Sequence, residues 1–334
     1  MAPNIWIVLL TYNGIDDTLK CLRSLENIKD PRMSVVVVDN GSNDNPLPAV
    51  QTGFPWAHTV KNADNFGFAG GNNRGIEYAL EHGADWVMLL NNDTIVSENF
   101  IERMADAVAA HPGYSIIGPV INYMDEPETV MTDGVLFNMP GSRGFFMRKP
   151  VEVTSATPPT ITEVDVVNGC CMMIAAPVFR SIGLIDERFF IYHEETDFCL
   201  RAKNAGYKSG VIGDQLVWHK GTSSFKKTGK ALPRYYDARN LVLVLAKHGG
   251  ARYQGRSIFG TSVMYVRYIY YRYCVEREDG HPESADAVIA GLSDALTRRY
   301  GRFAPARRPL VAPIRMLFEL GRRRPSWLAN WSRS

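Results

Sequence analysis

The stretch that decides the fold is Trp86-Val-Met-Leu-Leu90, followed at once by Asn91-Asn92-Asp93-Thr94. Five apolar residues in a row are typical of a strand buried on both faces, as strands of parallel sheets are. Ending such a strand in carboxamide and carboxylate groups makes sense if these groups hold an oxygen-seeking cation and a sugar hydroxyl. The sequence therefore predicts a buried strand with a binding site at its carboxyl end.

Three short β-branched runs precede this strand, and helical patterns alternate with the strands. The expected strands are Ile5 to Leu10, Ser34 to Val38 and His58 to Lys61, and the expected helices are 16–26 and 70–81, with a third from Ser97 to Ala110. Such alternation predicts an α/β fold with a mostly parallel central sheet and helices on both faces. Ligands of such a sheet bind beyond the carboxyl ends of its strands.

The rest of the chain divides into a loop-rich stretch and a helical one. We expect strands over 115–120, 163–174 and 208–212, an aromatic hairpin over 135–148 and a helix over 195–205. From Pro233 onward the pattern is almost wholly helical, over 235–247, 257–276, 283–300 and 309–322. The sequence thus predicts an α/β catalytic domain over residues 1–232 and a helical C-terminal region over residues 233–334.

Composition excludes several classes of protein. The chain of 334 residues is 46% hydrophobic and 22% charged, which is typical of a folded globular protein. No apolar run approaches the length of a membrane-spanning helix, and Ile5 to Leu10 lacks the flanks of a signal peptide, so we expect a cytoplasmic protein. Five cysteines without a CxxC spacing indicate free buried thiols and not a disulfide framework or a zinc site.

Charge is unevenly distributed along the chain. Residues 251–334 hold 15 arginines, no lysine and 7 acidic residues, a net charge of +8, which leaves −6 for residues 1–250. The arginines alternate with aromatic and aliphatic residues over 265–273 and 309–327. This mixture suits helices that lie on an anionic membrane surface, and it equally suits ordinary helices packed on the main domain. A nucleic-acid-binding tail is a third interpretation of the charge.

Polar segments follow the first three strands. Thr11-Tyr12-Asn13 ends the first, Asp39-Asn40-Gly41-Ser42 ends the second, and a loop with the spacing G-x-x-G-G runs from Asn65 to Asn73. Asp39 can accept hydrogen bonds from a base or a ribose, and the glycines let the backbone approach an anion at a helix N-terminus. The spacing is neither the dinucleotide fingerprint nor the P-loop. The alternative is that these residues simply build turns.

Two later clusters complete the candidate site. Glu194-Glu195-Thr196-Asp197 opens a helix with three carboxylates, where repulsion and partial burial should raise at least one pKa toward that of a general base. Helix capping is the simpler explanation of these acids. His219 lies in a loop of small residues, and its best functional interpretation is as a nitrogen ligand to the same cation as Asp93. The cation, Mg2+ or Mn2+, would take further ligands from water and substrate phosphates.

Taken in order, these segments resemble glycosyltransferase family 2, whose members have the GT-A fold and transfer sugars from nucleotide-diphosphate donors with inversion. The resemblance covers residues 4–250. Each motif that carries the resemblance is weak evidence by itself, but all six in the correct order are highly specific. The motifs are 11–13, 39–42, 65–73, 91–93, Glu194-Glu195-x-Asp197, and His219 with Gly221 and Ser223.

The resemblance implies a role for each motif. Asp39 would pair with the pyrimidine ring, and Thr11, Tyr12 and Asn13 would line the nucleoside pocket. Asn65, Gly67, Gly70 and Asn73 would shape the donor site. Asp93 and His219 would hold the metal, with Asn91 and Asn92 beside the donor. Glu195 aligns with the position of the family's catalytic base, which is usually an Asp in a Glu-Asp pair. Asp197 is the second candidate for the base, and Glu194 is the third acid of the cluster. The chain departs from the family's metal motif in keeping a single Asp there.

Two further segments are similar to bacterial rhamnosyltransferases of cell-surface polysaccharide assembly: 183–192 and Tyr235-Tyr236-Asp-Ala-Arg-Asn-Leu241. They imply dTDP-L-rhamnose as donor, a saccharide or polyprenyl-diphosphate-linked acceptor and no nucleic-acid partner. The basic C-terminal region would hold the enzyme at the inner face of the cell membrane. A UDP-sugar donor, for galactofuranosyl or N-acetylhexosaminyl transfer, is the alternative.

Two other classes of protein share parts of this pattern. A sugar nucleotidyltransferase should carry a glycine-rich loop with Lys or Arg directly after the first strand, and Thr11-Tyr12-Asn13-Gly14 is not such a loop. A non-catalytic nucleotide-sugar-binding protein of the same fold is the second alternative, because the metal motif contains a single Asp.

Overall fold

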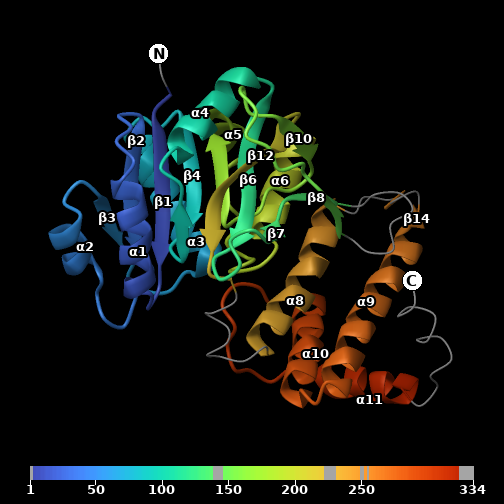
Figure 1. Ribbon diagram of the computed structural model, residues 1–334. Helices are drawn as coiled ribbons and strands as arrows, with labels where there is room; N and C mark the ends of the chain where they lie inside the picture. Colours follow the sequence, from blue (N-terminus) through green and yellow to red (C-terminus); the bar gives the residue numbers. More distant parts are fainter. Residues whose placement is uncertain (1–2, 138–145, 222–230, 249–251, 254–255, 323–334) are drawn as a thin grey trace. The chain divides into compact units, whose positions relative to one another are not determined.

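The computed structural model describes residues 3–137, 146–221, 231–248, 252–253 and 256–322 (Figure 1). The chain divides into two compact units: Met1–Phe190 with Glu194–Gly221, and Ile191–His193 with Thr222–Ser334. The first unit is built on a large sheet, and the second is helical. The predicted α/β fold with a helical C-terminal region is confirmed.

The central sheet has the strand order β10-β12-β6-β11-β4-β1-β2-β3. Neighbouring strands from β3 to β4 are parallel, β6 is parallel to β12, and β11 runs antiparallel between β4 and β6. The strands of this path are β1 (Ile5–Thr11), β2 (Met33–Asp39), β3 (His58–Lys61), β4 (Trp86–Asn91), β6 (Tyr114–Tyr123), β10 (Ile161–Val164), β11 (Cys171–Ala175) and β12 (Lys208–His219).

Short strands extend this architecture. β5 (Thr94–Val96) pairs with β12, and β7 (Val130–Thr132) pairs with β6. β8 (Gly134–Phe137) and β9 (Phe146–Lys149) form a separate two-stranded sheet, which is the predicted aromatic hairpin.

Helices cover both faces of the sheet because alternate side chains of its strands point to opposite sides. Ile5, Ile7 and Leu9 share a core cluster with residues of α1 and α4. On the other face, a Cβ at Gly75 of α3 would lie 2.3 Å from Val8, so α3 packs closely against β1. The helices of this unit are α1 (Ile15–Glu26), α2 (Leu47–Gly53), α3 (Gly67–Glu81), α4 (Phe100–Ala110), α5 (Ala176–Ile182) and α6 (Glu194–Asn204).

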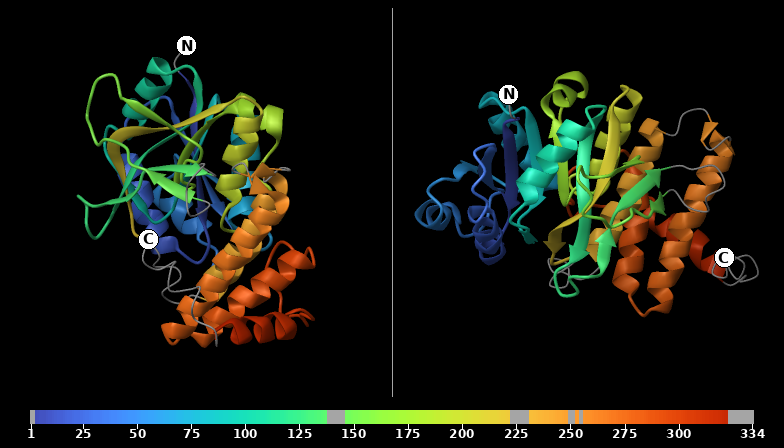
Figure 2. Two further views of the ribbon diagram at one scale, coloured as in Figure 1. Left: turned by 90° about the vertical axis from the view of Figure 1, so that its right-hand side faces the viewer. Right: turned by 45° about the horizontal axis from the view of Figure 1, so that its top comes forward.

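In the described part of the second unit, helix α10 contacts each of the helices α8, α9 and α11, and Figure 2 shows this helical unit from two further sides. These helices are α8 (Ala231–His248), α9 (Ile258–Glu278), α10 (Pro282–Leu296) and α11 (Val311–Arg322), with the short pair β13 (Arg252–Tyr253) and β14 (Arg256–Ser257). A Cβ at Gly291 would lie 2.3 Å from the carbonyl oxygen of Tyr235, so this glycine permits close contact between α8 and α10.

Several arginines of the second unit are engaged in ion pairs, as in Arg308–Asp294 and Arg315–Asp286. Part of the basic C-terminal charge is therefore used in ion pairs within this unit. Within the described ranges, every helix is too short or too polar to cross a bilayer.

Some predicted boundaries were wrong. The strand expected over 163–174 is two strands, β10 and β11, separated by a loop that contains Asn168. The strand expected over 208–212 continues as β12 to His219, with register shifts against β6 on either side of Gln215. The helix expected to begin at Ser97 begins at Phe100, with Asn99 at its N-cap. All five cysteines are free and buried, as predicted.

Candidate active site

The carboxyl ends of β1, β2 and β4 meet at one edge of the sheet because these strands are parallel. Thr11, the last residue of β1, pairs with Asp39, the last residue of β2. Leu10 pairs with Asn91 at the end of β4. Three segments that lie far apart in the sequence are thereby brought side by side.

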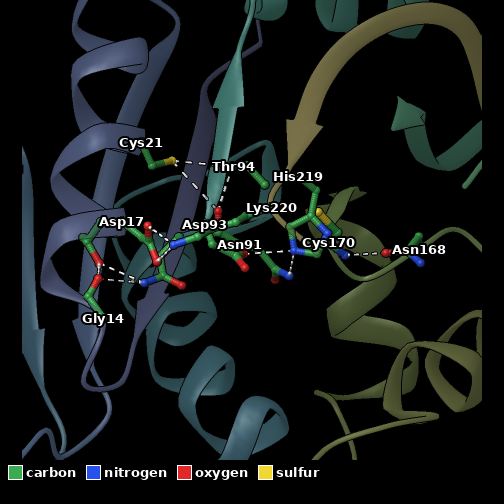
Figure 3. A network of polar contacts seen from close by, with 12 residues as sticks. Gly14, Asp17, Cys21, Asn91, Asp93, Thr94, Asn168, Cys170, His219 and Lys220 are labelled. Carbon is green, nitrogen blue, oxygen red and sulfur yellow. Dashed lines mark hydrogen bonds and ion pairs between the residues drawn. The ribbon is translucent and has the colours of Figure 1, made fainter. Parts of the chain in front are cut away.

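Asp93 and His219 form a close pair at this edge (Figure 3). Asp93 Oδ1 lies 2.9 Å from His219 Nε2, and Asn91 Nδ2 lies 3.4 Å from the same ring nitrogen. The pairing of β5 with the end of β12 sets this geometry, since Thr94 lies opposite His219. The backbone N–H of Lys220 adds a hydrogen bond to the Asp93 carbonyl oxygen at 3.0 Å.

These donors fit a divalent cation. A carboxylate oxygen and an imidazole nitrogen are both ligands of Mn2+. Nε2 is the nitrogen of the His219 ring that faces the Asp93 carboxylate. His219 Nδ1 is buried and has no hydrogen-bond partner among the described residues. No group of three or more His, Cys, Asp or Glu residues gathers there as a metal cluster within the described part of the chain. A cation at Asp93 and His219 would therefore need phosphate oxygens and water as further ligands.

Asp39 offers an unused buried acceptor. Its Oδ1 accepts the N–H of Ser42 at 3.0 Å, but its Oδ2 has no hydrogen-bond partner among the described residues. A buried carboxylate oxygen without a donor is costly, so a group that donates to it is favoured. The predicted contact between Asp39 and a pyrimidine ring requires such an oxygen.

Asn13 joins the loop after β1 to the loop after β2. Its N–H donates to Ser42 Oγ at 2.9 Å, and its side-chain oxygen accepts the N–H of Asn43 at 2.9 Å. Asn13 adopts a positive φ of 51°, which Asn tolerates better than most residues. The neighbouring Tyr12 ring is exposed. The two loops thus form one wall beside Asp39.

The glycine loop is held by Asn40, a residue to which the sequence gave no role of its own. The Asn40 amide donates to Asn65 Oδ1 at 3.1 Å and to the Gly67 carbonyl at 2.9 Å. Its oxygen accepts from Asn62 Nδ2 and from the backbone N–H of Phe66. Its position directly after Asp39, at the end of a buried strand, was the signal that could have identified it.

Position 67 accommodates only glycine. Its φ is +75°, and a Cβ there would lie 2.3 Å from the Phe190 carbonyl oxygen. Gly70 is nearly as crowded, since its Cβ would lie 2.8 Å from Phe66 Cβ. The loop at the start of α3 is therefore tightly packed.

Three residues predicted to bind the donor make hydrogen bonds within the protein. Asn92 Nδ2 donates to Thr18 Oγ1 at 2.9 Å and to the Gly14 carbonyl at 3.2 Å, and Thr11 Oγ1 accepts the Thr18 hydroxyl. Asn73 Nδ2 donates to the Ile185 carbonyl at 2.9 Å, and its Oδ1 accepts the Ile185 N–H. Their donor-binding roles stay predictions, while the structure shows that they brace the loops around the site.

The three acids of α6 lie in different environments. Asp197 is fully buried and pairs with Arg201 at 2.9 Å. Glu194 is buried, and its Oε2 has no hydrogen-bond partner among the described residues. Burial and the negative charge of Glu195 raise the pKa of Glu194 well above its usual range. The predicted raised pKa in this cluster is thus confirmed, and it belongs to Glu194. Glu195 is only partly buried.

A short loop connects Glu195 to the Asp93–His219 pair. A Cβ at Gly169 would lie 3.4 Å from Glu195 Cβ and 3.6 Å from the Phe68 ring of the glycine loop. The next residue, Cys170, accepts the backbone N–H of Asn91 at 2.9 Å. The acidic helix, the glycine loop and the end of β4 therefore meet around residues 169–170. These contacts place Glu195 beside the loop that holds the end of β4 at Asn91.

Comparison with known proteins agrees with this geometry. The profile of Glycosyl transferase family 2 matches residues 6–168. A dTDP-rhamnosyl transferase of Shigella flexneri is 30% identical over 74% of this chain and 82% of the relative. An N-acetylglucosaminyl-diphospho-decaprenol L-rhamnosyltransferase of Mycobacterium tuberculosis is 25% identical over 75% of this chain and 87% of the relative. A galactofuranosyltransferase of the same species is 26% identical over 68% of this chain and 73% of the relative.

Solved structures show the same fold. A mannosyltransferase from Pyrobaculum calidifontis, in complex with GDP-Man and Mn2+, superposes with a TM-score of 0.50 at 16% identity, covering 97% of this chain and 82% of that one. The fold is the GT-A fold that the resemblance implied. The extent of the match to the Shigella relative, together with the family profile, shows that the chain belongs to glycosyltransferase family 2.

Proposed function

We propose that the protein transfers L-rhamnose from dTDP-L-rhamnose, with inversion, to a hydroxyl of a saccharide or lipid-linked saccharide in the synthesis of a bacterial cell-surface polysaccharide. The observation that carries transfer from a nucleotide sugar is the Asp93–His219 pair, 2.9 Å apart beside the carboxyl ends of β1, β2 and β4. The donor sugar rests on similarity to the Shigella dTDP-rhamnosyl transferase.

In the proposed mechanism, the donor binds across the edge of the sheet. The thymine N–H donates to Asp39 Oδ2, the loops that Asn13 joins enclose the nucleoside, and the loop that Asn40 holds shapes the sugar site. Asp93 and His219 would hold Mg2+ or Mn2+. When bound, such an ion neutralises the charge that develops on the departing diphosphate.

Glu195 is the proposed base. Among the acids of α6 it is partly exposed and near the glycine loop, whereas Asp197 is already paired with Arg201. Glu195 takes the proton from the acceptor hydroxyl as that oxygen attacks the anomeric carbon on the face opposite the diphosphate. One displacement inverts the anomeric centre. Burial and the charge of Glu195 raise the pKa of Glu194, which disfavours a second negative charge beside Glu195.

Galactofuranosyl transfer from a UDP-sugar is the second candidate, because a galactofuranosyltransferase matches 68% of the chain at 26% identity. Asp39 can pair with uracil as well as with thymine, since both rings present the same imide N–H. The choice therefore depends on the sugar and not on the base.

The acceptor is proposed to be a sugar carried on polyprenyl diphosphate at the inner face of the cell membrane, since one relative is named for such an acceptor. Helix α11 offers a face for this membrane. The side chains of Met316, Leu317 and Leu320 are 59%, 62% and 54% exposed. Their spacing places them on the same side of the helix. Exposed apolar residues in a basic segment suit an anionic lipid surface.

A panel of nucleotide sugars, tested by thermal shift with and without Mn2+, tests the proposal because tight ligands stabilise the folded chain by mass action. We expect the largest shift with dTDP-rhamnose or dTDP, and rhamnosyl transfer to a lipid-linked acceptor. UDP-galactofuranose as the preferred donor would support the second candidate. If none of the pyrimidine nucleotides stabilises the chain, the proposal is wrong.

Hydrolysis or transfer separates an enzyme from a binding protein. Metal-dependent turnover of the donor that Glu195→Gln abolishes, with nucleotide binding retained, identifies an enzyme. Binding without turnover in the wild-type chain would identify a non-catalytic nucleotide-sugar-binding protein.

A further inference from the structure

The segment that leads into helix α6 has an unusual backbone. Phe190, Tyr192 and His193 have φ angles of 65°, 71° and 68°. Residues other than glycine rarely adopt this left-handed region, and they stay there only where surrounding contacts impose it. Glu194 and Glu195 follow directly, so the strained segment is covalently joined to the acids of the site.

Helix α8 supplies contacts that impose this conformation. The Asn240 side-chain amide donates to the carbonyl oxygens of Ile191 and Tyr192, each at 2.8 Å. Its oxygen accepts the Nε–H of Arg239 at 2.8 Å, which fixes the orientation of the amide. Asn240 and Arg239 are completely buried. With both ends engaged, Asn240 holds the two carbonyl groups in place.

Asp237, one turn earlier on α8, holds the third residue of the segment. Its Oδ1 accepts from His193 Nε2 at 3.0 Å, and its Oδ2 accepts the Tyr268 hydroxyl at 3.3 Å. Arg272 lies 3.7 Å from the same carboxylate. Burial alone would raise the pKa of Asp237, but the hydrogen bond from His193 and the nearby cations bring it below its usual value. The carboxylate is therefore charged and available as an acceptor at neutral pH.

We propose that Asp237 and Asn240 are positioning residues for Glu195. They hold the segment Ile191–His193, in which Tyr192 and His193 are left-handed, and the peptide bond from His193 to Glu194 passes this constraint to the first turn of α6. The inference rests on the proposed function, in which Glu195 accepts a proton from the acceptor. It also gives a role to the segment 235–241, which the donor site does not use.

The test compares variants of α8 in the full chain. Asn240→Asp puts a carboxylate oxygen where the amide donated to two carbonyl groups, so it breaks the clamp at nearly constant volume. We expect kcat to fall about 100-fold, as for a displacement of a catalytic group by about 1 Å, while donor KM and the Kd of dTDP change less than about twofold. Asp237→Ala should behave alike. Asp237→Asn keeps an oxygen for His193 and should retain most of the activity.

Tyr235→Phe is the matched control. It removes a buried hydrogen bond of the same helix, from Tyr235 to Asp294 at 2.7 Å, and touches neither carbonyl group of the segment. Hydrogen exchange of the amides of residues 190–197 should increase in Asn240→Asp and stay unchanged in Tyr235→Phe.

Three outcomes would overturn the inference. Equal loss of kcat in Tyr235→Phe would mean that general stability of the helical unit, and not the clamp, limits turnover. Faster exchange in Asn240→Asp with unchanged kcat would show a clamp that does not position the base, with the proposed function intact. A wild-type chain that binds no nucleotide sugar and transfers nothing would reject the proposed function and the positioning role together.

Discussion

His219 Nε2 lies 2.9 Å from Asp93 Oδ1 although 126 residues separate the two in the chain. The contact exists because the last residues of β12 pair with β5, directly after Asp93. A single carboxylate is a weak site for a divalent cation, and in the proposed metal site the histidine would supply a second ligand.

Replacing His219 should therefore impair metal use. His219→Ala should raise the Mn2+ concentration needed for half-maximal turnover by more than the roughly 10–100-fold typical of a residue that only supports a ligand. Titration of activity with Mn2+ at saturating donor measures this. His58→Ala, a change of an exposed histidine on β3, is the control. Equal metal dependence in both variants would remove His219 from the metal site.

Glu195→Gln should reduce kcat by about 100-fold to 10,000-fold, the usual contribution of a general base, because the amide cannot accept the acceptor's proton. The affinity for dTDP, measured by calorimetry, should stay unchanged. Wild-type turnover in this variant would move the role of base to another group.

Asp197→Asn should act on stability and not on the chemical step. Asp197 is fully buried against Arg201, and losing one partner of a buried ion pair costs about 3 kcal/mol in the free energy of unfolding. Denaturant unfolding at neutral pH gives this value. A large fall in kcat with an unchanged midpoint would contradict the structural role and favour Asp197 as the base.

Glu194→Gln should flatten the pH dependence of stability. Because the pKa of Glu194 is raised in the folded protein, the folded chain binds its proton more tightly than the unfolded chain. Its contribution to stability is therefore fully present below the unfolded pKa and is lost as the pH rises toward the folded pKa. Glutamine stays neutral throughout. Melting temperatures from about pH 4 to about pH 8 should fall less in the variant than in the wild type, and parallel curves would refute the assignment.

Gly67→Ala should weaken both folding and donor binding. The φ of +75° and the nearby Phe190 carbonyl leave no room for a methyl group, so a loss of more than about 1 kcal/mol in stability is expected. Gly53→Ala is the matched control, since a Cβ at Gly53 meets nothing within 4 Å. Similar unfolding midpoints for the two variants would show that the loop relaxes freely.

Replacing Met316, Leu317 and Leu320 together by serine should abolish binding to vesicles that contain anionic phospholipid, while turnover with a water-soluble acceptor is retained. Sedimentation with vesicles measures the loss. Wild-type chain that stays in solution, or that self-associates through this face in analytical ultracentrifugation, would reject the membrane role of α11.

Sequence patterns predicted the sheet and the strand ends well because they depend on local alternation of apolar and polar residues. They missed the continuation of β12 as far as His219, because it depends on pairing with β6 through register shifts and with β5 at the strand's end. They also gave no sign that Asn92 and Asn73 bond within the protein, or that Asn240 reaches Ile191. Such contacts depend on residues that meet only in the folded chain.

The order of strands in the sheet also dictates the order in which the site matures on the ribosome. β6 joins β4 only through β11, which is made more than 45 residues later, and His219 follows later still. A nascent chain can therefore assemble the wall around Asp39 first, but it gains His219, the proposed second metal ligand, only when the end of β12 has emerged. If the proposed site is right, termination before that point would leave the wall around Asp39 without the residue proposed to complete the metal site.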